Sequence, residues 1–133
     1  MAPRDVVVDA SALAKLFLHE PESAALRSWY TTQVASGARF AGPSLLGYEI
    51  AQTFARNLGP LDPKTFARHV QVALTGFDLH AVHDQVGPFL GKLTVYDASY
   101  VATAKRLSAR LVTYDQAMAK VARDHGVVVE TPI

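Results

Sequence analysis

Hydrophobic residues along this chain form two alternating patterns. Short continuous apolar runs such as Val6-Val7-Val8 are typical of strands that are buried on both faces. Between these runs, apolar residues recur at helical spacing. We therefore expect five strands, at residues 5–8, 39–41, 77–82, 110–113 and 127–130. We expect helices near residues 12–17, 21–35, 44–54, 66–74, 83–92, 97–107 and 116–124.

Several helix boundaries are predicted from single residues. Pro21 cannot continue a helix interior but can open the next helix. Ser44 and Asp97 are good N-cap residues, and we expect them to begin the third and sixth helices. Pro88 interrupts the helix expected over 83–92.

The alternation of strands with helices predicts a parallel sheet that is covered by helices on both faces. A chain of 133 residues is the size of one domain, so we expect a single domain over 1–133. Half of the residues are hydrophobic, which is enough for a substantial core.

Charge and composition exclude some classes of function. The net charge is +1, so any nucleic-acid site must be local rather than a broadly basic surface. There is no cysteine, which excludes disulfides and thiolate zinc sites. Neither a signal peptide nor a membrane span is evident, and we expect a soluble cytoplasmic protein without membrane contact.

Four acidic residues occupy positions that suit a common site. Asp9 ends the Val6–Val8 run, and Asp115 follows the strand expected at 110–113. In open α/β sheets, ligands bind at this carboxyl edge. Glu49 and Asp97 lie on expected helices, and none of the four has a basic neighbour in sequence. Converging carboxylates repel each other unless a cation lies between them, and oxygen ligands favour Mg²⁺ or Mn²⁺.

Each of these residues also has a purely structural interpretation. Asp9, Asp97 and Asp115 can cap the helices that follow them. Ser11 could be the cap instead of Asp9, which would leave Asp9 free for a cation. Glu49 could lie on a solvated helix border. From position alone, both interpretations stay open for each acid.

Four ordered segments resemble the PIN-domain nucleases, in particular the VapC-type toxins of prokaryotic toxin–antitoxin pairs. They are VVVDASAL at 6–13, PSLLGYEIAQ at 43–52, LTVYDASYVATAKRL at 93–107 and LVTYDQAMA at 111–119. The resemblance implies a three-layer α/β/α domain with about five parallel strands in the order 3-2-1-4-5. It assigns catalysis and metal binding to Asp9, Glu49, Asp97 and Asp115, with Ser11 and Thr113 in supporting positions.

The resemblance also implies an activity and partners. The activity is Mg²⁺- or Mn²⁺-dependent endonucleolytic cleavage of single-stranded RNA by in-line attack of a metal-activated water. The partners are a small antitoxin, whose C-terminal segment covers the active site, and further copies of the chain in a homodimer or larger assembly. Some relatives have a fifth acid after the fourth, where this chain reads Gln116-Ala117-Met118.

Substrate contacts are harder to assign. Five basic residues could line an approach to the site, although ordinary solvated charges explain them as well: Lys15, Arg27, Arg56, Lys105 and Arg106. Three tyrosines that neighbour the acids could stack on bases or simply pack: Tyr48, Tyr96 and Tyr114.

Other functions remain as alternatives. A haloacid-dehalogenase-like phosphatase would need an acid where Ser11 stands, and a receiver domain would need adjacent acids at the end of the first strand. A housekeeping RNA-processing PIN nuclease and a non-catalytic PIN-like interaction module are compatible with the same residues.

Overall fold

Five parallel strands form one sheet at the centre of the molecule. The structure is a computed structural model that describes residues 4–133. The strands are β1 (Asp5–Val8), β2 (Arg39–Pro43), β3 (Phe77–His80), β4 (Arg110–Val112) and β5 (Val129–Glu130), in the order β3-β2-β1-β4-β5. Val7 of β1 is paired with Ala41 on one side and Leu111 on the other. The predicted strand order 3-2-1-4-5 is confirmed.

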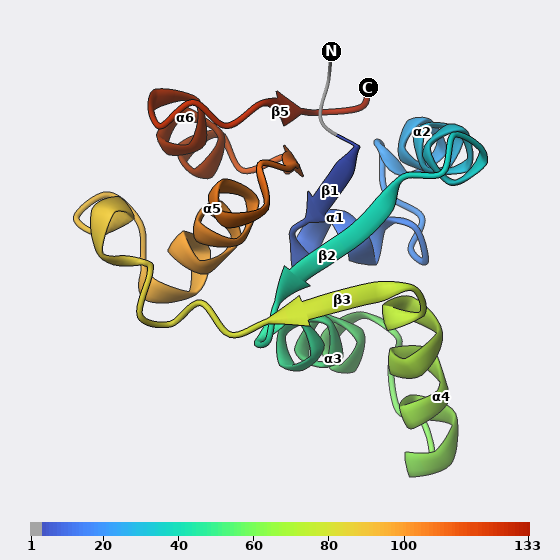
Figure 1. The fold of residues 1–133 in the computed structure, drawn as a ribbon. Coiled ribbons are helices and arrows are strands. Elements are labelled where there is room, and N and C mark those ends of the chain that lie inside the picture. The colour runs from blue at the N-terminus through green and yellow to red at the C-terminus, as the bar shows by residue number, and fades with distance from the viewer. Residues whose placement is uncertain (1–3) are drawn as a thin grey trace.

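Helices cover both faces of this sheet. They are α1 (Ala10–Lys15), α2 (Ser23–Ala35), α3 (Leu46–Asn57), α4 (Pro63–Leu74), α5 (Val95–Leu107) and α6 (Gln116–Asp124). Figure 1 shows α5 and α6 together on one side of the sheet and α1 to α4 on the other. Right-handed crossovers require this arrangement, because the chain steps in opposite directions from β1 to β3 and from β3 to β5. The expected three-layer α/β/α architecture is confirmed.

The core lies where α5 crosses the middle of the sheet. The β1 residues Val6, Val7 and Val8 are at most 1% exposed, which explains their continuous apolar run. Helix α5 contacts β1, β2 and β4, and seven consecutive residues from Ala98 to Ala104 are buried. Its buried hydroxyls do not lack partners, since Thr103 Oγ1 donates to the Ser99 carbonyl at 2.8 Å.

The helix expected over 83–92 is wrong. This segment contains only one 3-10 turn, η1 (Gly87–Phe89). Pro88 removes a backbone donor, and Gly91 takes a positive φ of 100°, which ends helical geometry. Val86 and Phe89 are nevertheless buried, so their helix-like spacing reflects packing of a loop onto the core.

Three predicted helix starts are also wrong. Helix α2 begins at Ser23 rather than at Pro21. Helix α3 begins after Leu45, without a side-chain cap, so Ser44 does not cap it. Helix α5 is capped by Thr94, whose Oγ1 accepts from the Asp97 backbone N–H at 3.1 Å. Asp97 is therefore not a cap but lies in the first turn of the helix.

A partly buried polar cluster joins α2 to strands β4 and β5. The Arg110 side chain is 8% exposed, and its Nη1 donates to Glu130 Oε1 at 3.0 Å. Arg110 Nη2 donates to Gln33 Oε1 at 2.6 Å, and Trp29 Nε1 donates to Glu130 Oε2 at 2.6 Å. Strand β5 has only two residues, so these side-chain bonds reinforce a short ladder.

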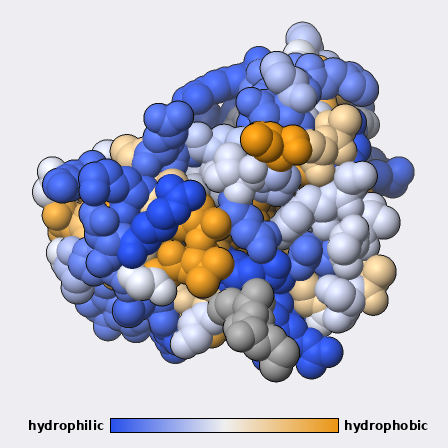
Figure 2. Space-filling model, turned by 90° about the horizontal axis from the view of Figure 1, so that it is seen from above, coloured by the Kyte–Doolittle hydropathy of each residue, from blue (hydrophilic) through white to orange (hydrophobic). Residues whose placement is uncertain are grey.

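None of the helices within residues 4–133 is long and apolar enough to cross a membrane. Figure 2 shows the face seen from above the view of Figure 1, where strongly hydrophobic side chains form small, separate groups in a mostly hydrophilic surface.

Candidate active site

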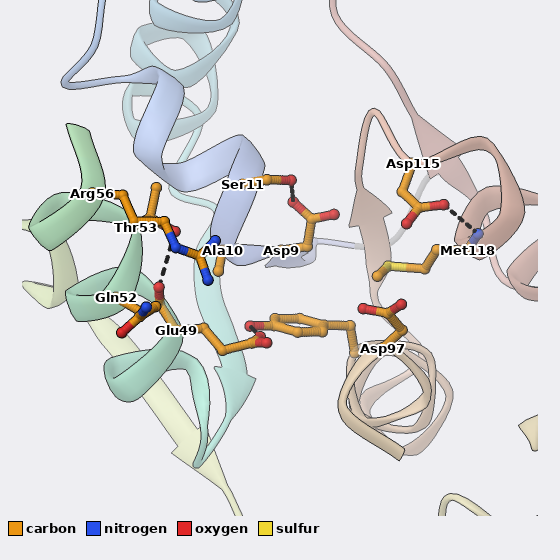
Figure 3. Close-up of a pocket in the computed structure, with 11 residues that line it drawn as sticks. Asp9, Ala10, Ser11, Glu49, Gln52, Thr53, Arg56, Asp97, Asp115 and Met118 are labelled. Carbon is orange, nitrogen blue, oxygen red and sulfur yellow. Dashed lines mark hydrogen bonds between the residues drawn. The ribbon is translucent and has the colours of Figure 1, made fainter. Parts of the chain in front are cut away.

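The four predicted acids line one pocket. Its volume is about 220 Å³, and Asp9, Glu49, Asp97 and Asp115 all contribute to its wall (Figure 3). The remaining lining residues are Ala10, Ser11, Gln52, Thr53, Arg56, Tyr100 and Met118. The pocket lies where β1, flanked by β2 and β4, ends at Asp9, which is the topological switch point of the sheet.

Asp9 is buried and firmly held. It is 3% exposed and caps α1, since its Oδ1 accepts from the Ala12 N–H at 2.8 Å. Ser11 Oγ donates to the same oxygen at 3.1 Å, so Asp9 rather than Ser11 is the cap. Burial raises the pKa of Asp9, whereas its hydrogen bonds from Thr113, Ala12 and Ser11 lower it.

Thr113 connects two of the acids. Its Oγ1 donates to Asp9 Oδ2 and accepts from the Asp115 backbone N–H, the latter at 3.0 Å. Thr113 is fully buried just beyond β4. Asp115 in turn caps α6, because its Oδ1 accepts from the Met118 N–H at 3.0 Å. One hydroxyl thus fixes the relative positions of Asp9 and the backbone of Asp115.

Glu49 is positioned by a residue from the opposite helical layer. It projects from α3, and the Tyr100 hydroxyl of α5 donates to Glu49 Oε1 at 2.5 Å. Burial raises the pKa of Glu49, and the charges of Asp97 and Asp9 raise it further. Burial also raises the pKa of Tyr100, which keeps its hydroxyl protonated as the donor.

Asp97 completes the group from the first turn of α5. Burial raises its pKa, and the charge of Asp115 adds to this increase. No Lys, Arg or His within residues 4–133 forms an ion pair with any of the four pocket acids. The pocket therefore gathers four carboxylates that form no ion pair within residues 4–133, and the one cationic side chain in its lining is Arg56.

This donor set has the chemistry of a site for a hard divalent cation. All four groups offer carboxylate oxygens, which Mg²⁺ and Mn²⁺ prefer. Burial and mutual repulsion raise the pKa values of Asp9, Glu49 and Asp97, and a bound cation would lower these pKa values again by stabilising the charged carboxylates. In residues 4–133, no three histidine, aspartate or glutamate side chains already form a group that could hold a metal ion. The acids share a pocket but not a closed coordination sphere.

Of the five basic residues considered from the sequence, only Arg56 lines the pocket. Lys15 pairs with Glu20 and Glu22 instead. The Arg27 guanidinium donates to the backbone carbonyls of Leu16 and Leu18. Lys105 Nζ donates to the His125 carbonyl at 2.6 Å.

Sequence reasoning missed Tyr100, Gln52 and Met118 as pocket residues. Tyr100 and Glu49 are 51 positions apart, so their hydrogen bond could be found only from the fold. Of the three tyrosines beside the acids, Tyr48 and Tyr96 are 84% and 64% exposed, whereas the Tyr114 hydroxyl donates to the Pro132 carbonyl.

Replacing Tyr100 by phenylalanine is expected to weaken divalent-cation affinity about tenfold, because partners that orient a metal ligand typically contribute 10- to 100-fold. Mn²⁺ affinity measured by isothermal titration calorimetry would test this. Tyr30→Phe is the matched control, since Tyr30 stacks on Phe40 away from the pocket. Equal affinities for both variants would contradict a positioning role for the Tyr100 hydroxyl.

Comparison with known proteins supports a family assignment. A profile of the PIN domain matches residues 6–124. The chain is 31% identical over 135 residues to Ribonuclease VapC47 of Mycobacterium tuberculosis (strain CDC 1551 / Oshkosh). This alignment covers 96% of this chain and 96% of VapC47.

Solved structures show the same fold. The crystal structure of PAE2754 from Pyrobaculum aerophilum has a TM-score of 0.65 and 24% identity, covering 94% of this chain and 83% of that one. A toxin–antitoxin complex from Klebsiella pneumoniae contains a chain with a TM-score of 0.64 and 18% identity, covering 96% of this chain and 98% of that one. With a profile match across most of its length and a full-length relative at 31% identity, the chain belongs to the PIN-domain family, and its relatives there are VapC ribonucleases.

Proposed function

We propose that this protein is a metal-dependent endoribonuclease that cleaves single-stranded RNA and acts as the toxin of a toxin–antitoxin pair. The observation that supports this most strongly is the pocket at the switch point, where Asp9, Glu49, Asp97 and Asp115 meet without a cationic partner from residues 4–133. The ribonuclease VapC47, a full-length relative, supports RNA as the substrate.

The cation would be held by Asp9, Asp97 and Asp115, with Glu49 binding it directly or through water. A bound Mg²⁺ or Mn²⁺ supplies an activated water and neutralises charge on the scissile phosphate. Hydrogen bonds of the Thr113 hydroxyl hold Asp9 and the backbone of Asp115 in position. The hydrogen bond from the Tyr100 hydroxyl holds Glu49. These hydrogen bonds pre-organise the oxygens before substrate arrives.

Hydrolysis would proceed without a covalent enzyme intermediate. The hydroxyl groups of Ser11 and Thr113 both donate hydrogen bonds to the Asp9 carboxylate. Thr113 is fully buried and its hydroxyl also accepts from the Asp115 N–H, and Ser11 binds the same Asp9 oxygen as the Ala12 N–H, so both hydroxyls are held as partners of Asp9. Ser11 and Thr113 therefore support Asp9, and water is the nucleophile in the proposed reaction.

Arg56 would contact the substrate backbone. It is exposed, lines the acidic pocket and forms no ion pair within residues 4–133. Arginine presents a fork of N–H donors that matches phosphate oxygens. In Figure 3 it lies on the side of the pocket opposite Asp115, so it would bind a phosphate next to the scissile one, which would lie over the acids.

An antitoxin and further copies of the chain are proposed partners. The structural likeness to a chain of a toxin–antitoxin complex supports the first of these. A pocket with four acids would attract a basic antitoxin segment, which would compete with the cation and RNA. Exposed Tyr48 and Tyr96 next to the pocket acids suit either a protein contact or base stacking.

Cleavage of a mixed-sequence single-stranded RNA by the purified protein would test the proposal. We expect cutting with Mg²⁺ or Mn²⁺, none with EDTA, and inhibition by a basic antitoxin if the gene neighbourhood supplies one. Metal binding without cutting of any RNA would favour the alternative of a PIN-like interaction module. Cutting that does not arrest growth when the protein is expressed would favour a housekeeping RNA-processing nuclease.

Activity is expected to depend jointly on pH and Mg²⁺. Since the pKa values of Asp9, Glu49 and Asp97 are raised, protons compete with the cation at a higher pH than they would at ordinary carboxylates. At low Mg²⁺, kcat/KM should fall as the pH is lowered, and more Mg²⁺ should move the midpoint to lower pH. A midpoint pH that does not change with the Mg²⁺ concentration would contradict metal binding by these acids.

A further inference from the structure

A second cavity adjoins the acidic pocket on the side of α6. Its volume is about 380 Å³, larger than the acidic pocket, and the two cavities share Asp115 as a lining residue. Its other walls come from the end of β4, from α6 and from the C-terminal segment. They are formed by Thr113, Tyr114, Gln116, Ala119, Arg123 and Thr131.

The polar groups of this cavity divide into two sets. Tyr114 and Thr131 use their hydroxyls to bind the backbone, donating to the Pro132 and Thr113 carbonyls. Gln116 and Arg123 are exposed, and the hydrogen bonds of residues 4–133 include none from either side chain. They project from one face of α6, separated by two helical turns. A guanidinium and an amide thus remain available to a ligand.

The neighbouring charge on the same helix behaves differently. Lys120 pairs with Asp124 at 3.1 Å and lines neither cavity. Other exposed cations, such as Lys64 and Arg68, also lack an acidic partner within residues 4–133, so what sets Arg123 apart from them is that it lines a cavity adjoining Asp115.

The two cavities together place charges in an order that suits a polynucleotide. Arg56 lines the far side of the acidic pocket from Asp115, as Figure 3 shows, and Arg123 lies beyond Asp115 in the second cavity. The order is cation, acidic cluster, cation. A strand whose scissile phosphate lies over the acids has its next phosphates on either side, where a guanidinium can bind each of them.

We infer that the second cavity is a subsite for the nucleotide adjacent to the scissile phosphate, with Arg123 as a positioning residue for its phosphate. The Gln116 amide, as donor and acceptor, would bind the base edge or the ribose 2′-hydroxyl of that nucleotide. This inference rests on the proposed nuclease function, and its ligand is one nucleotide unit of a single-stranded RNA.

A phosphate-by-phosphate interference experiment tests the subsite. A short RNA with a single cut, chosen from the cleavage products of a mixed-sequence RNA, is synthesised with a neutral methylphosphonate on one or the other side of the cut. For the unaltered protein, we expect one replacement to raise KM about tenfold, because it removes a charge-assisted hydrogen bond. On natural RNA, Arg123→Ala should raise KM about as much, with little change in kcat. On the methylphosphonate RNA that raises KM for the unaltered protein, Arg123→Ala should raise KM no further.

Controls separate this role from general electrostatics. Lys120→Ala removes the same charge from the same helix and should behave as the unaltered protein. Arg123→Lys should restore part of the lost affinity, because lysine keeps the charge but not the fork. If the methylphosphonate raised KM by the same factor for Arg123→Ala as for the unaltered protein, the proposed subsite would be wrong, while the proposed nuclease function would still stand. An unaltered protein that cuts no RNA would overturn both proposals.

Discussion

Replacing Asp97 by asparagine is expected to abolish RNA cleavage and to stabilise the protein slightly in the presence of EDTA. Asparagine keeps the size of the side chain but removes one negative charge from the acidic pocket. Losing a proposed metal ligand should reduce the cleavage rate at least about a hundredfold, since the bound cation supplies several kcal/mol of transition-state stabilisation.

The stability gain follows from the sign of the pKa shift. Burial and the charge of Asp115 raise the pKa of Asp97 in the folded protein, so the folded state binds its proton more tightly than the unfolded state does. The contribution of Asp97 to stability therefore falls as the pH rises past its unfolded pKa and is unfavourable at neutral pH. Removing the charge removes this cost.

Thermal unfolding of Asp97→Asn and of the unaltered protein, each in EDTA and in Mg²⁺, would measure this difference in stability. The unaltered protein should gain stability from Mg²⁺, by about 2.7 kcal/mol at a concentration 100 times Kd, and Asp97→Asn should gain far less. Asp84→Asn is the matched control, because Asp84 is exposed and lies outside the acidic pocket. An Asp97→Asn variant that melts lower than the unaltered protein in EDTA would indicate a structural role for the carboxylate.

Replacing Glu130 by alanine is expected to destabilise the fold by about 3 kcal/mol, because removal of one partner leaves a buried charge uncompensated. Arg110 would lose its only carboxylate partner within residues 4–133, and its Nε is already a buried atom without a hydrogen bond. Trp29 Nε1 would lose its acceptor as well. The short strand β5 would then detach more readily from β4.

Urea unfolding followed by circular dichroism would measure this loss. Lys120→Ala, which breaks the exposed pair with Asp124, should cost less than about 1 kcal/mol. The double variant Arg110→Met/Glu130→Leu should recover much of the stability lost by Glu130→Ala, since apolar replacement removes the buried Arg110 charge together with its half-buried partner. A cost for Glu130→Ala no larger than that for Lys120→Ala would show that water solvates Arg110 adequately.

The sequence was sufficient for those features that are set locally. The Val6–Val8 run followed by Asp9 predicts a buried strand with a carboxylate at its end, because apolar residues on both faces of a strand leave few other arrangements. The convergence of Asp9 with Asp115 needed the strand order as well, which came from the family resemblance and is confirmed by the sheet.

Other features were beyond local reasoning. The segment 83–92 has helical spacing, yet its apolar residues pack as a loop because Pro88 and Gly91 break the helix. Asp97 is a good capping residue in isolation, but Thr94 takes that role and leaves the carboxylate in the pocket. The contact between Tyr100 and Glu49 depends on how the layers formed by α3 and α5 meet around the sheet edge, which no short segment encodes.

The central claim is that a cation held by the four acids is required to cut RNA. The most direct test is to titrate Mn²⁺ into the metal-free protein and to follow bound Mn²⁺ by electron paramagnetic resonance and RNA cleavage in the same samples. We predict that cleavage rises in proportion to bound Mn²⁺, and that Asp97→Asn loses both. Cleavage that persists without bound Mn²⁺, or full Mn²⁺ binding by Asp97→Asn, would contradict the proposal.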